Sequence, residues 1–502
     1  MATTHQEIER KYEGALRRPP ATDGLPQVAR AVAGGTEQLD AVYFDTAGLR
    51  LLRAGITLRR RTGGHDAGWH LKIPGADGIR TEIRLPPDAG DARRPPKELV
   101  RLTRGLARGE PLAPAARLRT RRERTLLVDA GGGTLAELVR DEVTAQTLGA
   151  AAGAEGATEV SSWVETEVEL DAGAPDLLDA VERDLRDQGL RPAAEASKLA
   201  RVLGGRLPSV PDAGPPAGSV GAALTGYLRD HVAALLALDP AVRADLPDAI
   251  HRMRVHVRRL RSALAAHRRL LDRAAADRLD GELRRLGRVL GRARDAEALG
   301  QLLGPQAAGL PSAGRPQEVG ALLSSWFGHR YAREQRAAVH AMRDQRYYAL
   351  LDAAEEFAAH PPLRRRAARG KAQARRVLKH QRRRTVRRLD AALDLPAGPD
   401  RDRALHRARK AAKRARYAAE SVAPVAGQRA GRLRKRMKRL QEPLGAHHDA
   451  VVAGPALLEV TAEARRRGRD TFGYGLLFAA QRREADEQVG RAREARRRLK
   501  GA

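Results

Sequence analysis

The N-terminal segment places two carboxylates and one ammonium group at regular two-residue intervals, in Glu7, Glu9 and Lys11. On a β-strand this spacing projects all three side chains from one face, because successive side chains alternate between faces. A hard divalent cation such as Mg²⁺ or Mn²⁺ takes oxygen ligands from carboxylates, water and phosphate, and a neighbouring ammonium group suits a polyanion. On a helix the same residues would be an ordinary solvated charge cluster. The pattern therefore indicates a metal and phosphate site only if this segment is a strand.

A second acidic run, Val-Glu-Thr-Glu-Val-Glu-Leu at residues 164–170, has the same period of two. As a strand it carries Glu165, Glu167 and Glu169 on one face, and Val, Thr and Leu on the other. Charged side chains can line the interior of a closed sheet only if that interior holds water, ions or an ionic ligand. If the sheet is closed, this acidic face therefore requires a polar interior.

The elements that would position these acids form a domain of strands with interspersed helices over residues 1–205. Segments that alternate or are rich in β-formers are separated by Gly, Pro and Asp turns, at 41–45, 57–61, 69–73, 80–85, 119–127 and 163–170. Residues 206–219 contain four prolines and two glycines and are typical of a linker. Ala/Leu/Arg segments at helical spacing follow, broken near 304–316, 361–362 and 396–399. We expect a helical domain over 220–502, with halves at about 220–360 and 361–502.

The helical domain contains an internal repeat. The quartet His251, Arg254, Arg258 and Arg261 recurs at an offset of 155 residues as His406, Arg409, Lys413 and Arg416. At about 100° per residue, each quartet falls in one stripe along a helix. No acidic residue occurs from 249 to 271 or from 403 to 419. A bound anion would neutralise such stripes, so they are predicted to bind a polyanion.

The charge of the whole chain agrees with this prediction. The formal net charge is +31, and residues 1–206 hold 31 basic and 31 acidic residues, so the whole excess lies in the helical part. Such a surplus indicates nucleic acid, an anionic membrane or polyphosphate as the partner. Aromatic residues make up only 3% of the chain, which argues against stacking on single-stranded nucleic acid. Few bulky anchors and apolar positions suited to bundle packing argue against a membrane.

Cysteine is absent from the sequence, which excludes disulfides and thiolate metal sites. The first thirty residues are charged, and no apolar run approaches the roughly 20 residues of a membrane span. We therefore expect a cytoplasmic protein, with an association with polyphosphate granules.

The N-terminal part resembles the CYTH domains of the triphosphate tunnel metalloenzymes through an ordered set of motifs. These are Glu7-Ile-Glu9-Arg-Lys11, Tyr43-Phe-Asp45-Thr46, Leu58-Arg59-Arg60-Arg61, Trp69-His-Leu-Lys72, Arg80-Thr-Glu82, Glu165-Thr-Glu167-Val-Glu169-Leu170 and Ser197-Lys198-Leu199. The resemblance implies an antiparallel eight-stranded tunnel in which acids hold Mg²⁺ or Mn²⁺ and bases hold a triphosphate. Arg84 stands where relatives often have another acid, which leaves open how that strand contributes to metal binding.

Carried onto this chain, the resemblance implies roles for individual residues. The metal ligands would be Glu7, Glu9, Glu167 and Glu169. The triphosphate ligands would be Lys11, Arg59, Arg61, Lys72, Arg80, Arg119, Arg121 and Lys198, of which Lys11, Arg59, Arg61 and Lys72 would also be catalytic. Arg119 and Arg121 are chosen among four neighbouring arginines by parity with the other strands.

The C-terminal part resembles the CHAD domain, a helical domain with conserved histidines. The His-x-x-Arg-x-x-x-Arg/Lys-x-x-Arg stripes at His251 and His406 carry the resemblance, and Arg294-Asp295 and His448-Asp449 match its second motif imperfectly. In the family these stripes bind inorganic polyphosphate. The order of the two domains is that of bacterial proteins that include inorganic triphosphatases.

The sequence thus predicts an α+β protein in which the tunnel hydrolyses inorganic triphosphate with a divalent metal and the helical domain binds polyphosphate. One alternative is a polyphosphate-binding adaptor without turnover, and another is a basic nucleic-acid-binding protein. No general base can be named, because each candidate carboxylate is also a candidate metal ligand.

Overall fold

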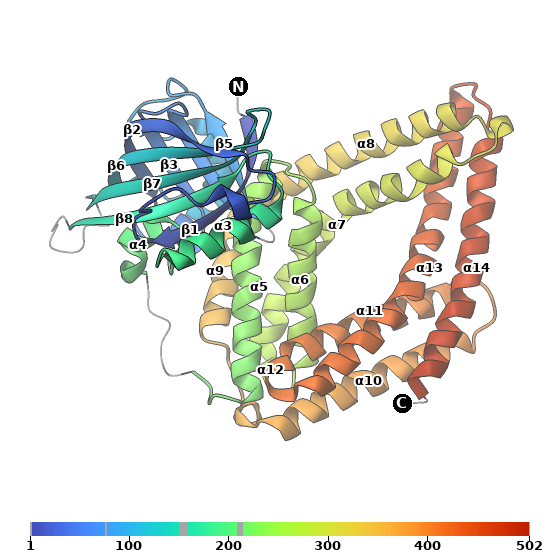
Figure 1. Cartoon of the computed structure of the whole chain (residues 1–502). Coiled ribbons are helices and arrows are strands. Elements are labelled where there is room, and N and C mark those ends of the chain that lie inside the picture. The colour runs from blue at the N-terminus through green and yellow to red at the C-terminus, as the bar shows by residue number, and fades with distance from the viewer. Residues whose placement is uncertain (1–2, 76–77, 150–158, 208–213, 501–502) are drawn as a thin grey trace. The chain divides into compact units, whose positions relative to one another are not determined.

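In the computed structural model, which describes residues 3–75, 78–149, 159–207 and 214–500, the chain forms two compact units. One unit comprises Met1–Ser209 with Leu236–Ala244, and the other comprises Val210–Leu235 with Asp245–Ala502. Part of the expected linker, residues 208–213, lies outside the described residues. The first unit is built mainly from strands and the second entirely from helices (Figure 1).

The first unit is a closed antiparallel barrel of eight strands, as predicted. The strands pair in the order β5-β4-β3-β2-β6-β7-β8-β1, and β5 also pairs with β1, which closes the sheet. A two-residue strand, β9 (Arg191–Pro192), adds to β1. The barrel strands are β1 (Thr3–Glu13), β2 (Arg30–Asp45), β3 (Thr57–Thr62), β4 (Gly68–Pro74), β5 (Ile79–Leu85), β6 (Ala113–Val128), β7 (Thr134–Thr147) and β8 (Val160–Leu170).

Four helices accompany the barrel: α1 (Arg50–Arg53), α2 (Lys97–Ala107), α3 (Pro175–Asp187) and α4 (Lys198–Leu203). The apolar side chains of β1, β7 and β8 point outward and pack against α3, where Tyr12, Leu138, Val168 and Val181 are buried. This arrangement places the apolar core outside the barrel. Because strand side chains alternate, the opposite, polar set of β1 and β8 side chains faces the lumen.

Ten α-helices follow the barrel in the described sequence, and all belong to the second unit except the last part of α5 (Figure 1): α5 (Val220–Arg243), α6 (Ala249–Ala266), α7 (Arg273–Ala308), α8 (Pro316–Ala341), α9 (Gln345–Ala359), α10 (Lys371–Leu393), α11 (Pro399–Ser421), α12 (Ala423–Ala426), α13 (Gln428–Arg466) and α14 (Phe472–Lys500). One core joins α10, α11, α13 and α14, and another joins α7, α8, α13 and α14. Helices α6 and α11, which carry the repeated quartets, contact each other. None of the described helices is both long enough and apolar enough to cross a bilayer.

Candidate functional site

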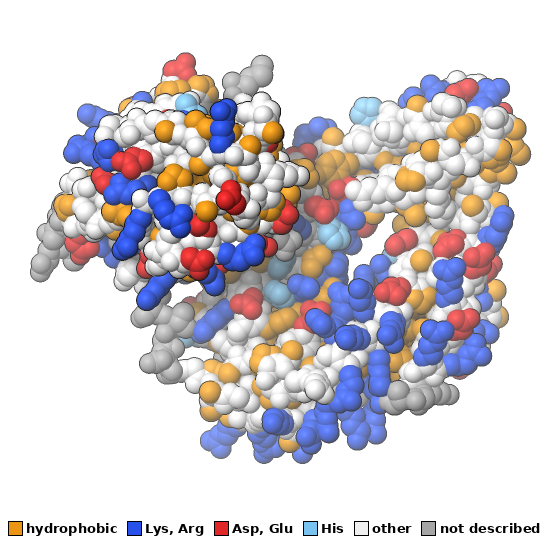
Figure 2. Space-filling model, in the orientation of Figure 1, with side chains coloured by type: hydrophobic (Ala, Val, Ile, Leu, Met, Phe, Trp, Pro, Cys, Tyr) orange, Lys and Arg blue, Asp and Glu red, His pale blue; other side chains and the backbone are white. Residues whose placement is uncertain are grey.

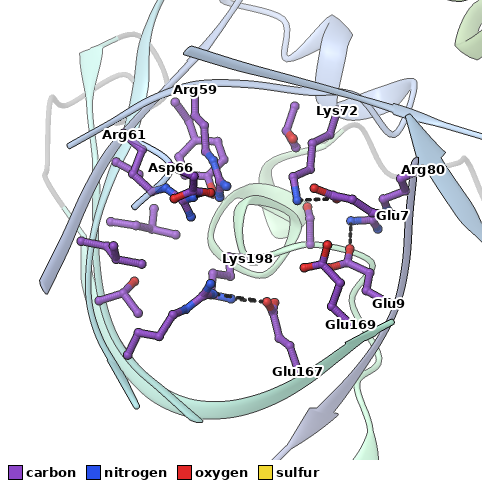
Figure 3. Close-up of a pocket in the computed structure, with 18 of the residues that line it drawn as sticks. Glu7, Glu9, Arg59, Arg61, Asp66, Lys72, Arg80, Glu167, Glu169 and Lys198 are labelled. Atoms are coloured by element: carbon purple, nitrogen blue, oxygen red, sulfur yellow. Dashed lines mark hydrogen bonds and ion pairs between the residues drawn. The ribbon is translucent and has the colours of Figure 1, made fainter. Parts of the chain in front are cut away.

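Charged side chains line the lumen of the barrel (Figure 3). They come from strands β1, β3, β4, β5, β6 and β8, from the β3–β4 turn and from the first residue of α4. Eight cations and five acids contribute: Lys11, Arg59, Arg61, Lys72, Arg80, Arg84, Arg122 and Lys198, and Glu7, Glu9, Asp66, Glu167 and Glu169. The cavity between them is about 80 Å³, which is room for a few water molecules. Charged groups of both signs thus line the lumen, which suits an ionic ligand.

Glu7 and Glu9 share the lumen face of β1, and each is held by a cation. Lys72 Nζ donates to Glu7 Oε2 at 2.6 Å, and Arg80 Nη1 donates to Glu9 Oε1 at 2.6 Å (Figure 3). Lys11 Nζ donates to the other oxygen of Glu9 at 3.1 Å. Burial alone would raise the pKa of Glu9, but Lys11 and the other nearby cations lower it to about 2. Glu9 is therefore an anion at neutral pH.

Glu169, which lies beside Glu7 and Glu9 in Figure 3, has no cationic partner within ion-pair distance among the described residues. Desolvation in the lumen and the charges of Glu7 and Glu9 raise the pKa of Glu169 to about 7. A divalent cation held by these carboxylates would relieve the repulsion among them. The residues present therefore fit a hard, oxygen-ligated metal ion.

A second acidic cluster lies on the wall formed by β7 and β8. Ligand oxygens of Asp141, Glu165 and Glu167 lie within 4.8 Å of one another. Lys198 Nζ contacts all three, at 2.9 Å from Asp141 and 2.6 Å from each glutamate. Arg122 also forms a bidentate pair with Asp141, at 2.8 and 2.7 Å. An ammonium group is thus already the cation of this cluster, as Lys72, Arg80 and Lys11 are for Glu7 and Glu9.

The opposite wall, formed by β3, is cationic. Arg59 Nη1 donates to the hydroxyl oxygen of Tyr43 at 3.2 Å, and Arg61 pairs with Asp66 of the β3–β4 turn. The Nε atoms of both arginines are buried without a hydrogen-bond partner in the described part of the chain. Burial and the charges of Arg59 and Arg122 lower the pKa of Arg61 to about 9. An anion in the lumen would stabilise both guanidinium groups.

The prediction that Arg119 and Arg121 point into the lumen was wrong. Their side chains are 69% and 43% exposed on the outer face of β6. Leu118, Thr120 and Arg122 take the inward positions instead, because their register with β2 pairs them with positions on its lumen-facing side. Parity borrowed from neighbouring strands cannot fix the phase of β6, since pairing register alone decides which face points inward.

The structure also brings into the site residues that the sequence reasoning did not assign. Glu82 is fully buried, His70 Nδ1 lies 2.9 Å from its Oε1, and Lys72 lies 3.7 Å from the same oxygen. Burial would raise the pKa of Glu82, but His70 and Lys72 hold it well below its ordinary value. The motif Arg80-Thr-Glu82 could have pointed to this acid. Asp141 gave no such signal, because β7 was not predicted as a strand.

In the helical unit, the two repeated quartets make equivalent contacts. Arg254 of α6 donates to Asp295 at 2.8 Å, and the repeat-equivalent Arg409 of α11 lies 3.8 Å from Asp449. Carboxylates absent from the local sequence are thus supplied by α7 and α13. The two stripes also approach each other across the α6–α11 contact, where Arg258 Nε donates to the hydroxyl oxygen of Tyr417 at 3.2 Å.

These carboxylates do not neutralise all of the positive charge that the described residues of the two stripes carry. Among the described residues, no carboxylate lies within ion-pair distance of Lys413, and burial with the charges of Arg409 and Arg258 lowers its pKa to about 7. His406 stacks on His448 with ring centroids 4.2 Å apart, and burial lowers the pKa of His406 to about 4. Arg261 pairs with Asp280, and Arg416 pairs with Glu420. His251, the first residue of the N-terminal quartet, lies on α6 with the other three members.

Comparison with known proteins also divides the chain into an N-terminal and a C-terminal domain. Residues 5–202 match the CYTH domain and residues 226–458 match the CHAD domain. The uncharacterized proteins Rv2226 and MT2285 of Mycobacterium tuberculosis are each 40% identical over 498 residues, which cover 96% of this chain and 93% of theirs. The chain belongs to the CYTH–CHAD family.

Two solved structures resemble this CYTH–CHAD protein in part. PptA from Streptomyces chartreusis is 23% identical, with a TM-score of 0.46, and the match covers 56% of this chain and 99% of PptA. The CHAD domain from the plant Ricinus communis is 24% identical, with a TM-score of 0.44, and covers 58% of this chain and 95% of its own. The predicted domain identities and fold class are thus confirmed by the family matches and the fold of the chain itself.

Proposed function

We propose that the CYTH domain hydrolyses inorganic triphosphate with Mg²⁺ or Mn²⁺ in its lumen, and that the CHAD domain binds inorganic polyphosphate. The observation that carries the proposal is the pairing inside the lumen. Two carboxylates suited to a metal, Glu7 and Glu9, are ion-paired with three cations suited to phosphate, Lys72, Arg80 and Lys11.

A metal–triphosphate complex carries both a cation and an anion, so it could replace the partners of the carboxylates and of the basic side chains at the same time. Its cation would bind the carboxylates, and its phosphate oxygens would accept hydrogen bonds from the released lysines and arginine. Neither set would then remain buried without a counter-charge, which is the costly state for a group in a closed lumen. This exchange explains why a lumen that is nearly filled by its own ion pairs could still admit a charged substrate.

The residues would divide the work of phosphoryl transfer between them. Glu7, Glu9 and Glu169 would hold the metal, which when bound neutralises phosphate charge as a Lewis acid. Lys11, Lys72 and Arg59 would position and neutralise the phosphates, and most of catalysis in this reaction class is positioning and charge stabilisation. Arg80 and Lys198 would join them, and Arg122 replaces Arg119 and Arg121 as the arginine contributed by β6. Glu167 is held by Lys198 and Lys11, so we place it beside the phosphates rather than at the metal.

Polyphosphate binding by the CHAD domain is supported by the meeting of the two cationic stripes. Lys413 is surrounded by Arg409 and Arg258 and has no paired carboxylate in the described chain. A flexible linear polyanion could neutralise both stripes at once, and it needs no stacking platform. We expect this binding to weaken with salt, as it does for other polyanion complexes.

A polyphosphate-binding adaptor without turnover is the second candidate. The observation in its favour is that Glu7 and Glu9 already form ion pairs with lysine and arginine side chains of the lumen. Such a lumen could take up phosphate through its cations alone.

Phosphate release from tripolyphosphate separates the two candidates. The full chain is assayed with Mg²⁺, with Mn²⁺ and with chelator, beside a Glu7→Gln/Glu9→Gln double variant. Glu13→Gln is the matched control, because Glu13 lies on the same strand but is exposed and does not line the lumen. Metal-dependent release that is lost in the double variant and kept in Glu13→Gln supports the triphosphatase. Binding without release in all three proteins would favour the adaptor.

A further inference from the structure

One acid of the lumen stands apart from the others. Four of the five lumen acids come from β1 and β8, whereas Asp66 comes from the β3–β4 turn and lies among the cations of the opposite wall (Figure 3). It pairs with Arg61, whose side chain is only 4% exposed. Asp66 is thus paired with the guanidinium group of Arg61, to which a substrate phosphate in the lumen would otherwise bind.

The turn that carries Asp66 is held firmly in place. Gly63 has a φ of +79°, and a Cβ atom there would lie 2.0 Å from the carbonyl oxygen of Gln38, so the turn lies directly on β2. On the other side, His70 Nε2 lies 2.9 Å from the backbone oxygen of Asp66. The inward position of the Asp66 carboxylate is therefore built into the backbone of the turn.

Asp66 also lies at one end of the row of phosphate-binding cations. Arg61 is one residue from the end of β3, and the turn that follows marks that end of the barrel wall. A second carboxylate, Glu37, lies on the same face of β2 as the lumen-lining Leu39 and Ala41, where it pairs with His65 of the same turn and with Arg124 of β6. A phosphate chain that extended past Arg61 would meet both carboxylates.

We propose that Asp66 limits the length of the phosphate chain that the lumen accepts, by competing with substrate phosphate for Arg61. A short chain binds to Lys11, Lys72 and Arg59 and leaves the Arg61–Asp66 pair intact, so Arg61 does not act as the triphosphate ligand that the resemblance implied. A longer chain must displace Asp66, which leaves that carboxylate inside the lumen beside a polyanion. The inference rests on the proposed phosphate-binding function, and it makes Asp66 a specificity-determining residue.

The test compares the affinity of the full chain for linear chains of three and five phosphates, by titration calorimetry in chelator, where no metal is present. Binding to the lumen is taken as the part that Arg59→Ala removes, which subtracts binding elsewhere on the protein. Asp66→Asn keeps the size of the side chain and removes its charge. Asp88→Asn is the matched control, because Asp88 is exposed and outside the lumen.

We expect Asp66→Asn to raise the affinity for the five-phosphate chain relative to the three-phosphate chain by about tenfold, or about 1.4 kcal/mol. Asp88→Asn should leave this ratio unchanged. An unchanged ratio in Asp66→Asn, or weaker binding of both chains, would overturn the inference and make Asp66 a residue that merely positions Arg61. Equal gains for both chains would also overturn it.

The experiment separates this inference from the proposed hydrolysis. If no variant releases phosphate but the affinity ratio shifts, triphosphatase activity fails and the role of Asp66 stands. If wild type shows no Arg59-dependent binding of either chain, the role of Asp66 fails together with phosphate binding in the lumen.

Discussion

The contacts of Lys198 make its replacement the most informative perturbation of the CYTH domain. Its ammonium group, on a side chain only 10% exposed, lies 2.6–2.9 Å from three carboxylates that are themselves at most 11% exposed. In Lys198→Met, Asp141 keeps Arg122 and Glu167 keeps Lys11. Among the described residues, Glu165 then keeps only the indole N–H of Trp163, at 2.6 Å. One buried carboxylate thus loses the one cation that the described part of the chain supplies to it.

Breaking a buried ion pair in this way costs about 3–5 kcal/mol. Because two of the three carboxylates retain partners, we expect the lower end, about 3 kcal/mol. In a domain of this size that loss lowers the melting temperature by about 6–12 °C. Lys97→Met is the control, because Lys97 is exposed at the start of α2, and its melting temperature should stay within about 2 °C of wild type.

The loss should depend on pH in a defined direction. Burial opposes the charge of Asp141 and Glu167, but Lys198 and the other cations depress both pKa values below their ordinary range. Groups with depressed folded-state pKa values stabilise the fold above their unfolded pKa values, near 4, and lose that contribution as the pH falls. The difference between wild type and Lys198→Met should therefore stay large from pH 7.5 down to about pH 4 and shrink as the pH falls further.

Thermal unfolding followed by tryptophan fluorescence can measure this in the full chain. The three tryptophans are Trp69 and Trp163 in the CYTH domain and Trp326 in the CHAD domain, so a Trp326→Phe background reports the CYTH domain alone. Mn²⁺ should raise the melting temperature of Lys198→Met more than that of wild type. The substitution removes the ammonium group from among Asp141, Glu165 and Glu167, and Mn²⁺ could then bind to these carboxylates in its place. A variant as stable as wild type at pH 7.5, or a deficit that does not change with pH, would refute the reasoning.

Three further predictions test other parts of the site. Arg122→Gln should raise the KM for tripolyphosphate about tenfold or more, whereas Arg119→Gln on the outer face should leave it within about twofold; steady-state kinetics decide this. Because the pKa of Glu169 is raised to about 7, its carboxylate is ionised above that pH, so Mn²⁺ affinity in a titration should be higher at pH 8 than at pH 6. Glu169→Gln should flatten this dependence. Because the pKa of Lys413 is lowered to about 7, its charge is present below that pH, so polyphosphate should bind more tightly at pH 6 than at pH 8. Lys413→Arg should remove that difference, while Lys438→Arg, at an exposed position of α13, should keep it.

Part of the fold could be predicted from the strand and helix periodicities of the sequence. Carboxylates at alternate positions of β1 and β8 share one face of each strand, as the alternation predicted, while the closed sheet was implied by the resemblance to CYTH domains. The repeat of 155 residues predicted two related halves, and equal spacing on two helices places Arg254 and Arg409 on equivalent faces, but their pairing with Asp295 and Asp449 was not predicted. The ordered motifs supported the domain identities over nearly the whole chain.

Other parts of the site depend on contacts between distant segments. Residues 119 and 122 of β6 must face opposite sides because they are an odd number of positions apart, but only the register with β2 decides that Arg122 is the one that points inward. The partners of the repeated arginines lie about 40 residues further along the chain, on α7 and α13, so the absence of local acids did not leave every cation unpaired.

The sequence by itself determined which residue types face the lumen from β1 and β8 and which helices carry the cationic stripes, because side-chain alternation and helical periodicity are local properties of the backbone. Only the tertiary structure decided which charges meet. Lys198 reaches Asp141 and Asp66 reaches Arg61 because barrel closure, strand register and a glycine-dependent turn bring them together. Ion pairing depends on distances of a few ångströms between separate elements, and those distances are fixed only when the elements pack.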